Sequence, residues 1–227
     1  MSSIKLRHLC NTTLESVLPA DAIVANGAQL RDLGASLSSL SGFRTQFAPT
    51  SGAMGYGVPA AIAAKAMHPH RIVVAFAGDG CFLMTGQELA TAVQYRLNVI
   101  FIVVKNNMCG TIRMHQEREF PGHVYGTALS NPDFGGYARA FWASGEVVEA
   151  TTEFAPAFAR AMKAGKPALI EIRIDPEAIS PNTALRAIRA AALKWSHAET
   201  RDKKHSLVAK QPGVSRPAAV RAALIPA

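Results

Sequence analysis

The chain has 227 residues, of which 49% are hydrophobic, and a formal net charge of +8. This length and composition predict one substantial α/β core and argue against three domains. The charge is concentrated near the C-terminus, because residues 185–227 carry nine Lys or Arg and only two acidic residues. The rest of the chain is close to neutral, which disfavours a protein whose core binds nucleic acid.

The cysteines and the apolar stretches limit the compartment. Cys10, Cys81 and Cys109 lack metal-finger spacing, and their odd number argues against a closed disulfide framework. No apolar stretch approaches the length of a membrane span, and Met1 to Thr13 lacks the apolar core of a secretion signal. We therefore expect a cytoplasmic protein with no membrane partner.

Apolar periodicity predicts helices and strands that alternate along the chain. The expected helices are Val58 to Met67, Thr85 to Tyr95, Pro132 to Trp142 and Thr152 to Ala164, and the expected strands are Ile72 to Ala77, Val99 to Val104, Glu146 to Glu149 and Ala168 to Ile174. This order predicts an α/β fold with a doubly wound, mainly parallel sheet, helices on both faces and a site at the carboxyl edge.

The expected domain organisation has three parts. Residues 1–20 form an N-terminal segment, residues 21–184 form the globular domain, and residues 185–227 form a basic tail. Arg201-Asp202-Lys203-Lys204 and Lys210 lie among Ala, Pro, Ser and Gln with little periodicity, which predicts a flexible or loosely helical extension. A basic tail attracts phosphates nonspecifically, but no DNA-reading motif or interleaved aromatic residues accompany it.

Two polar loop tips have an informative spacing. Asp79 lies in the turn Gly78-Asp79-Gly80 after one predicted strand, and Asn106 follows the next strand after a step of 27 residues. A right-handed crossover places the carboxyl ends of two such parallel strands side by side. One carboxylate and one amide oxygen therefore face the same crevice.

These oxygen ligands suit Mg²⁺, which usually takes one or two carboxylates together with phosphate oxygens and water. That chemistry predicts a bound diphosphate. The glycines beside Asp79 allow the backbone to approach such a group, and the following helix N-terminus offers free N–H donors.

The residues at these positions resemble a known family. Gly78-Asp79-Gly80 and Asn106 are similar to the diphosphate and metal signature of thiamine-diphosphate (TPP) enzymes. The stretches Thr50 to Ala61 and Thr85 to Leu89 resemble the C-terminal TPP-binding domain of the acetolactate synthase-like group. The resemblance extends from about Ala22 to about Pro181, and its combined motifs are specific, whereas a lone Gly-Asp-Gly would carry no weight.

The resemblance implies a set of cofactor and metal residues. Asp79, the side chain of Asn106 and the carbonyl of Met108 would ligate Mg²⁺. The backbone of Gly52 and Met54 would hold the aminopyrimidine ring, Met84 would separate the two rings, and the N–H groups of Gly80 and Cys81 would face the diphosphate. The full expected cofactor-binding set is Gly52, Met54, Gly78, Asp79, Gly80, Cys81, Met84, Asn106, Met108 and Gly110.

The sequence departs from the family pattern at several positions. Lys105 replaces an asparagine and Asn107 replaces a glycine, and a register shifted by one residue would make Asn107 the ligand. Cys81 stands where serine is common, and Gln29 and Leu30 stand at the second glycine and following amide of the family's diphosphate loop. These changes predict reduced cofactor affinity.

Simpler interpretations exist for each residue. Asp79 alone could be an ordinary turn residue, and Asn106-Asn107 an ordinary loop pair. His68-Pro69-His70 is interpreted as a surface connection rather than a metal pair. His115 and Glu117 either approach substrate or lie on a solvated helix face, and the sequence leaves both open.

The resemblance also indicates what this segment lacks. In the family, the glutamate that activates the cofactor comes from a separate pyrimidine-binding domain, usually on another subunit, and no catalytic residue is assigned here. The first hypothesis is therefore a TPP-binding half of a transferase or lyase acting on 2-oxo acids such as pyruvate, within an oligomer. The second is a truncated, inactive relative that binds TPP, and the third is a phosphate or nucleic-acid binder that uses its tail.

Overall fold

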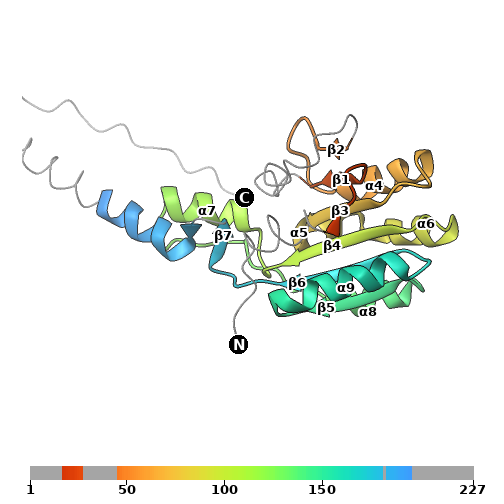
Figure 1. The fold of residues 1–227 in the computed structure, drawn as a ribbon. Coiled ribbons are helices and arrows are strands. Elements are labelled where there is room, and N and C mark those ends of the chain that lie inside the picture. The colour runs from red at the N-terminus through yellow and green to blue at the C-terminus, as the bar shows by residue number, and fades with distance from the viewer. Residues whose placement is uncertain (1–16, 28–44, 181–182, 196–227) are drawn as a thin grey trace, which may run out of the picture.

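The computed structural model describes residues 17–27, 45–180 and 183–195. In this part of the chain a six-stranded sheet has the order β2-β1-β3-β4-β6-β5, and its neighbouring strands pair in parallel (Figure 1). The strands are β1 (Ile23–Asn26), β2 (Gln46–Phe47), β3 (Val73–Gly78), β4 (Val99–Lys105), β5 (Ser144–Val148) and β6 (Ala168–Arg173). The predicted mainly parallel α/β sheet is confirmed.

Helices and a small hairpin complete the described fold. The helices are α4 (Gly57–Met67), α5 (Asp79–Thr85), the 3-10 helix η3 (Gly86–Glu88), α6 (Leu89–Gln94), α7 (Gly110–Glu119), α8 (Phe134–Ala140) and α9 (Thr151–Lys163). Strands β7 (Ala178–Ser180) and β8 (Thr183–Ala184) form an antiparallel pair after the main sheet. Residues 185–195 then form a helix.

The central strands are buried on both faces, as parallel strands usually are. On one face Phe154 and Phe158 of α9 pack against alternate residues of β1, β3, β4 and β6. On the other face α4, α5, α6 and α8 cover the remaining alternate residues, with Phe82 and Phe134 in edge-to-face contact at 5.5 Å between ring centroids. Helices therefore cover both faces of the sheet, as the sequence predicts.

The structure differs from the helix predicted over Thr85 to Tyr95. The chain is already helical at Asp79, and it passes through α5 and the short η3 before α6 begins. The early start is favoured because the Asp79 carboxylate accepts the N–H of Gly80 in the first turn. The break coincides with Gly86, where an added Cβ would lie 2.7 Å from the Phe82 ring.

The close packing of the domain depends on glycine at Gly145. A Cβ added there would lie 2.1 Å from the carbonyl oxygen of Gly135. Because backbone rather than a flexible side chain occupies that space, β5 and α8 can approach this closely only with glycine at this position.

Candidate cofactor site

The two loop tips singled out in the sequence lie next to each other. Strands β3 and β4 are neighbours, with Gly78 opposite Val104, so Asp79 and Asn106 both follow the carboxyl ends of adjacent strands. The backbone N–H of Asn106 lies 3.2 Å from Asp79 Oδ2, and the Asp79 residue is 1% exposed. The predicted proximity is therefore present.

Polar neighbours surround the Asp79 carboxylate. Its Oδ2 atom accepts the N–H groups of Asn106 and Asn107 and the Nδ2 of Asn131, at 3.2, 2.7 and 2.7 Å. Its Oδ1 atom accepts only the N–H of Gly80, at 2.9 Å, among the contacts of the described residues. A carboxylate oxygen has two lone pairs, so Oδ1 retains the capacity to bind a cation.

No described Lys or Arg forms an ion pair with Asp79. Glu171, by contrast, pairs with Lys105 at 3.3 Å and with Arg173 at 2.8 Å, and is also buried. A buried charge is costly unless it is paired or coordinates a metal. The hydrogen bonds around Asp79 hold its negative charge in place without neutralising it.

A small cavity lies in front of this carboxylate. It has a volume of about 60 Å³, and its lining includes Asp79, Asn106 and Met108. Asn106 Oδ1 accepts the N–H of Met108 at 3.2 Å and, like Asp79 Oδ1, retains acceptor capacity. The volume suits an ion with water, since a cavity needs about 10–15 Å³ of such space to hold one water. These hard oxygen atoms fit Mg²⁺. A coenzyme bound to that ion would extend beyond the cavity.

The geometry also distinguishes Asn106 from Asn107. Asn107 has a φ of +58°, in the left-handed region where glycine is favoured and asparagine is tolerated. Its side-chain oxygen accepts the amide of Asn131 at 3.0 Å, whereas Asn106 lines the cavity. This favours the register in which Asn107 occupies the family's glycine position and Asn106 the ligand position.

Further predicted cofactor residues border the same region. Gly78 and Gly110 line the cavity. A Cβ added at Gly80 would lie 3.6 Å from the Met54 side chain. Met84 is 56% exposed, so its side chain is accessible to a ligand.

The other two predicted residues differ in exposure. Gly52 is exposed, with a φ of +70°. Cys81 is buried near Gly27, so only its backbone N–H is suited to face a diphosphate. Together with the residues above, these positions remain a prediction for cofactor contact.

Lys105 has a structural role that explains why it differs from the family pattern. Its Nζ donates to the carbonyl of Pro132 at 3.0 Å, pairs with the buried Glu171 and lies 5.5 Å from the centre of the Phe134 ring. Glu171 also accepts the N–H of Phe134 at 2.9 Å. Lys105 thus joins β4 to β6 and to the start of α8, and is not among the residues that line the cavity at Asp79.

Sequence reasoning missed Asn131. Its amide donates to both Asp79 and Asn107, while its own Oδ1 is buried without a hydrogen-bond partner in the structure. The backbone of this segment also holds the loop of residues 106–109, because Leu129 N donates to Asn107 O and Cys109 N donates to Thr127 O. The sequence signal was the Asn131-Pro132 pair, which marks a turn but does not reveal its distant partner.

Helix α7 corrects the interpretation of Glu117. His115 is exposed, as a solvated helix face requires, but Glu117 is fully buried. Its carboxylate binds Arg113, Arg189 and the N–H of Gly122. The Arg189 hydrogen bond, aided by Gly122 and Arg113 and opposed by burial, lowers the pKa of Glu117 to about 2.

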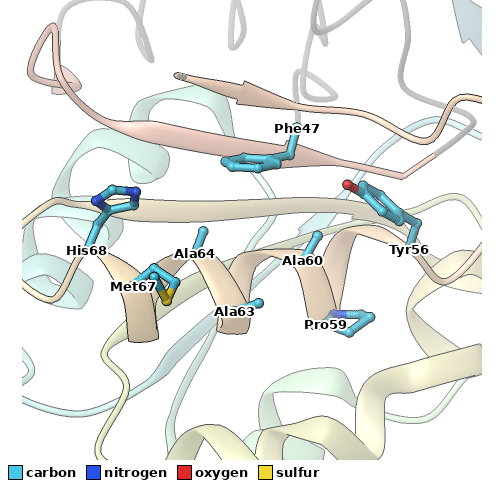
Figure 2. A pocket seen from close by; sticks show the side chains of 8 residues that line it. All are labelled: Phe47, Tyr56, Pro59, Ala60, Ala63, Ala64, Met67 and His68. Carbon is cyan, nitrogen blue, oxygen red and sulfur yellow. The ribbon is translucent and has the colours of Figure 1, made fainter. Parts of the chain in front are cut away.

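A second, larger cavity offers different chemistry. It has a volume of about 570 Å³ and lies between Phe47 of β2 and the apolar face of α4 (Figure 2). Small apolar side chains such as Ala60 and Ala64 dominate its lining, with Tyr56 and His68 at its ends (Figure 2). It lacks the convergent polar groups that a diphosphate requires, so the smaller cavity at Asp79 is the better cofactor candidate.

Three other expectations can be placed against the fold. His68-Pro69-His70 connects α4 to β3, and among the described residues no three His, Cys, Asp or Glu side chains gather as a metal cluster. Within the same residues, no helix has the length and apolar character to cross a membrane. Gln29, Leu30, Arg201 to Lys204 and Lys210 lie outside the described residues.

The family model "Thiamine pyrophosphate enzyme, C-terminal TPP binding domain" matches residues 32–172. Because this match covers more than half of the chain, the protein belongs to that family. The resemblance inferred from the motifs is thereby confirmed.

Comparisons with individual proteins support the same family assignment. The chain is 33% identical over 183 residues to a 2-hydroxyacyl-CoA lyase of Oryza sativa subsp. japonica, covering 76% of this chain and 31% of that protein. It is 36% identical over 124 residues to the mitochondrial acetolactate synthase catalytic subunit of Aspergillus candidus, covering 55% and 18% respectively. A thiamine diphosphate-dependent 4-hydroxybenzoylformate decarboxylase of Rhodococcus jostii RHA1 aligns in structure with a TM-score of 0.70 and 28% identity, covering 77% of this chain and 33% of that one. The chain spans about a third or less of the length of these relatives.

Proposed function

We propose that this chain binds thiamine diphosphate through Mg²⁺ as the TPP-binding half of an acetolactate synthase-like enzyme acting on 2-oxo acids such as pyruvate. The observation that carries the proposal is the buried Asp79 carboxylate, which has no described cationic partner and borders a polar cavity with Asn106 and Met108. A divalent cation would neutralise that charge, and the diphosphate would complete its coordination.

The residues of the chain would hold and orient the coenzyme. Asp79 Oδ1, Asn106 Oδ1 and the Met108 carbonyl would bind the metal, while the N–H groups at the start of α5 would face the diphosphate. The exposed Met84 would contact the rings outside the cavity. When bound, the coenzyme supplies the electron sink for cleavage beside a carbonyl. A separate pyrimidine-binding domain would supply the activating glutamate, within an oligomer in the cytoplasm.

Calorimetry on the full chain tests the cofactor proposal. Titration of TPP should release heat with Mg²⁺ present and little heat with a chelator. Asp79→Ala and Asn106→Ala should each abolish or strongly weaken that heat, whereas Asp21→Ala, an exposed position outside the cavity, should leave it unchanged. Binding that survives both site substitutions would contradict the assigned ligands.

Activity requires a second experiment, because a truncated relative that binds TPP without catalysis is the alternative function. Co-purification with a separately encoded pyrimidine-binding protein, followed by a pyruvate turnover assay, should show turnover only for the pair. A chain that binds TPP but finds no such partner would support the inactive alternative.

A further inference from the structure

The polar cavity at Asp79 has a second wall, formed by residues 174–179 after strand β6. Ile174, Ala178 and Ile179 line it, opposite a first wall that includes Asn106 and Met108. The hairpin of β7 and β8 that contains Ala178 and Ile179 leads directly into the helix of residues 185–195. Leu185 N donates to the Glu177 carbonyl at 3.0 Å. This hydrogen bond fixes the start of the helix next to the residues that form this wall.

The wall that includes Asn106 and Met108 is also connected to the helix of residues 185–195, through α7. Helix α7 begins at Gly110, two residues after the proposed ligand Met108, and Glu117 lies near its far end. From Gly110 to Glu117 the helix rises roughly 10 Å at about 1.5 Å per residue. There the buried Glu117 carboxylate binds Arg189 of the C-terminal helix through Nε at 2.7 Å and also through Nη2. Figure 1 shows this helix lying beside α7.

The two walls of the cavity therefore meet again at one ion pair, between the buried Glu117 carboxylate and the partly exposed Arg189 guanidinium. Arg113 supplies the second guanidinium to Glu117, at 2.8 Å. Because Arg113 lies on α7 itself, this contact does not connect α7 to another element. Arg189 is the partner that connects α7 to the segment carrying Ile179. Loss of Arg189 would leave a buried carboxylate with one guanidinium, which favours separation of the two helices and entry of water.

We propose that Glu117 and Arg189 are positioning residues for the cation site, fixing the Met108 side and the Ile179 side of the cavity relative to each other. This inference rests on the proposed function. Neither residue lines the cavity, so each acts through the elements it joins. Binding of Mg²⁺ and TPP at one end of α7 and docking of residues 185–195 at the other end are then coupled, and the coupling is reciprocal.

The simpler role for the pair is to attach the C-terminal helix with no effect on the cavity. Affinity measurements separate the two roles. In the full chain, Arg189→Gln should weaken binding of Mn²⁺ and TPP about tenfold, while Arg186→Gln, which removes the same charge from an exposed position of the same helix, should not. Arg189→Lys should restore part of the loss because it keeps the charge. Far-UV circular dichroism at the assay temperature verifies that every variant compared is folded.

A spectroscopic measurement tests the coupling itself. The chain has two tryptophans, and Trp142→Phe leaves only Trp195, which lines a hollow between residues 185–195 and Arg118 and Pro121 at the end of α7. Mg²⁺ with TPP should shift Trp195 emission and slow hydrogen exchange in residues 185–195. Arg189→Gln should abolish both effects at saturating cofactor, whereas Arg186→Gln should retain them.

The outcomes distinguish the two proposals. TPP binding that is lost in Asp79→Asn but equal in Arg189→Gln and Arg186→Gln, with no response of residues 185–195, overturns the positioning role and leaves the proposed function intact. Failure of the unmodified chain to bind Mn²⁺ and TPP overturns both.

Discussion

Two buried carboxylates, Asp79 at the start of α5 and Glu117 near the end of α7, have different surroundings. Asp79 accepts hydrogen bonds from backbone N–H groups and from the neutral amide of Asn131. Glu117 accepts them from two guanidinium groups and one backbone N–H. The chain thus neutralises Glu117 internally, while it only orients the charge of Asp79.

This difference separates a structural carboxylate from a ligand carboxylate. Burial alone does not, because both residues are at most 1% exposed. What distinguishes them is whether the countercharge belongs to the protein. Substituting each carboxylate by its amide should therefore have different main consequences. At Glu117 the main loss is of folding stability, and cofactor binding weakens only through the elements that Glu117 joins. At Asp79 the main loss is of cofactor binding.

The largest stability effect is expected for Glu117→Gln. It leaves Arg113 and Arg189 without their buried partner. Both guanidinium groups are partly exposed, so the expected cost is about 3 kcal/mol of unfolding free energy, the lower end of the range for fully buried pairs. Urea unfolding followed by circular dichroism measures the change. Glu119→Gln, at an exposed position of the same helix, serves as control and should change the unfolding free energy by less than about 0.5 kcal/mol. Equal effects of the two substitutions would contradict the assigned role of Glu117.

Asp79→Asn should show the reverse pattern. The amide keeps an oxygen for the N–H groups of Asn106 and Asn107 but turns its NH2 toward the N–H of Gly80, so the unfolding free energy should fall by about 1–2 kcal/mol. Affinity for Mg²⁺ and TPP should fall at least about 100-fold, equivalent to about 2.8 kcal/mol. Paired unfolding and calorimetry on the same preparation would test this, with Asp21→Asn as control. A large stability loss with unchanged binding would mean that Asp79 is structural.

The pH dependence of stability offers a third test. Because the pKa of Glu117 falls from 4.5 to about 2 on folding, its contribution is fully present above about pH 4.5 and is lost as the pH falls toward 2. Between pH 6 and pH 3 the unmodified chain should lose about 2 kcal/mol more than Glu117→Gln does. Urea midpoints measured across this range would show it, and parallel curves for the two proteins would contradict it.

A smaller effect is expected for Asn131→Ala. This change removes one donor from Asp79 Oδ2 and one from Asn107, but leaves the two backbone donors to that carboxylate in place. Affinity for Mg²⁺ and TPP should fall about tenfold, or about 1.4 kcal/mol. Calorimetry measures it, and Asn131→Asp would add a charge beside Asp79 that should weaken binding of the diphosphate further. Unchanged affinity in Asn131→Ala would show that the backbone alone orients Asp79.

The sequence predicted the parts of this fold that depend on local pattern. Buried parallel strands are near-continuous apolar runs, so β3, β4 and β6 were found within a residue or two of their observed ends. β2 has two residues, too few for a periodic pattern, and it was not predicted. The helix start at Asp79 was missed because a Gly-Asp-Gly turn and a helix N-terminus have similar compositions.

The site was predictable only where two strand ends meet in a known topology. That rule placed Asp79 beside Asn106, but it could not find Asn131, which reaches Asp79 across 52 positions of sequence. Nor could it show that Glu117 is buried, because its partner Arg189 lies 72 positions away in a segment whose composition predicts a solvated tail. Long-range pairs between polar residues leave no periodic signal in a single sequence.

The most direct test of the cation site is a crystal structure of the full chain with Mn²⁺ and TPP. An anomalous difference map should show one Mn²⁺ peak within coordination distance of Asp79 Oδ1, Asn106 Oδ1 and the carbonyl oxygen of Met108, with diphosphate oxygens completing the octahedron. A peak bound by Asn107 instead of Asn106, or a diphosphate held away from Asp79 with no metal beside it, would contradict the account.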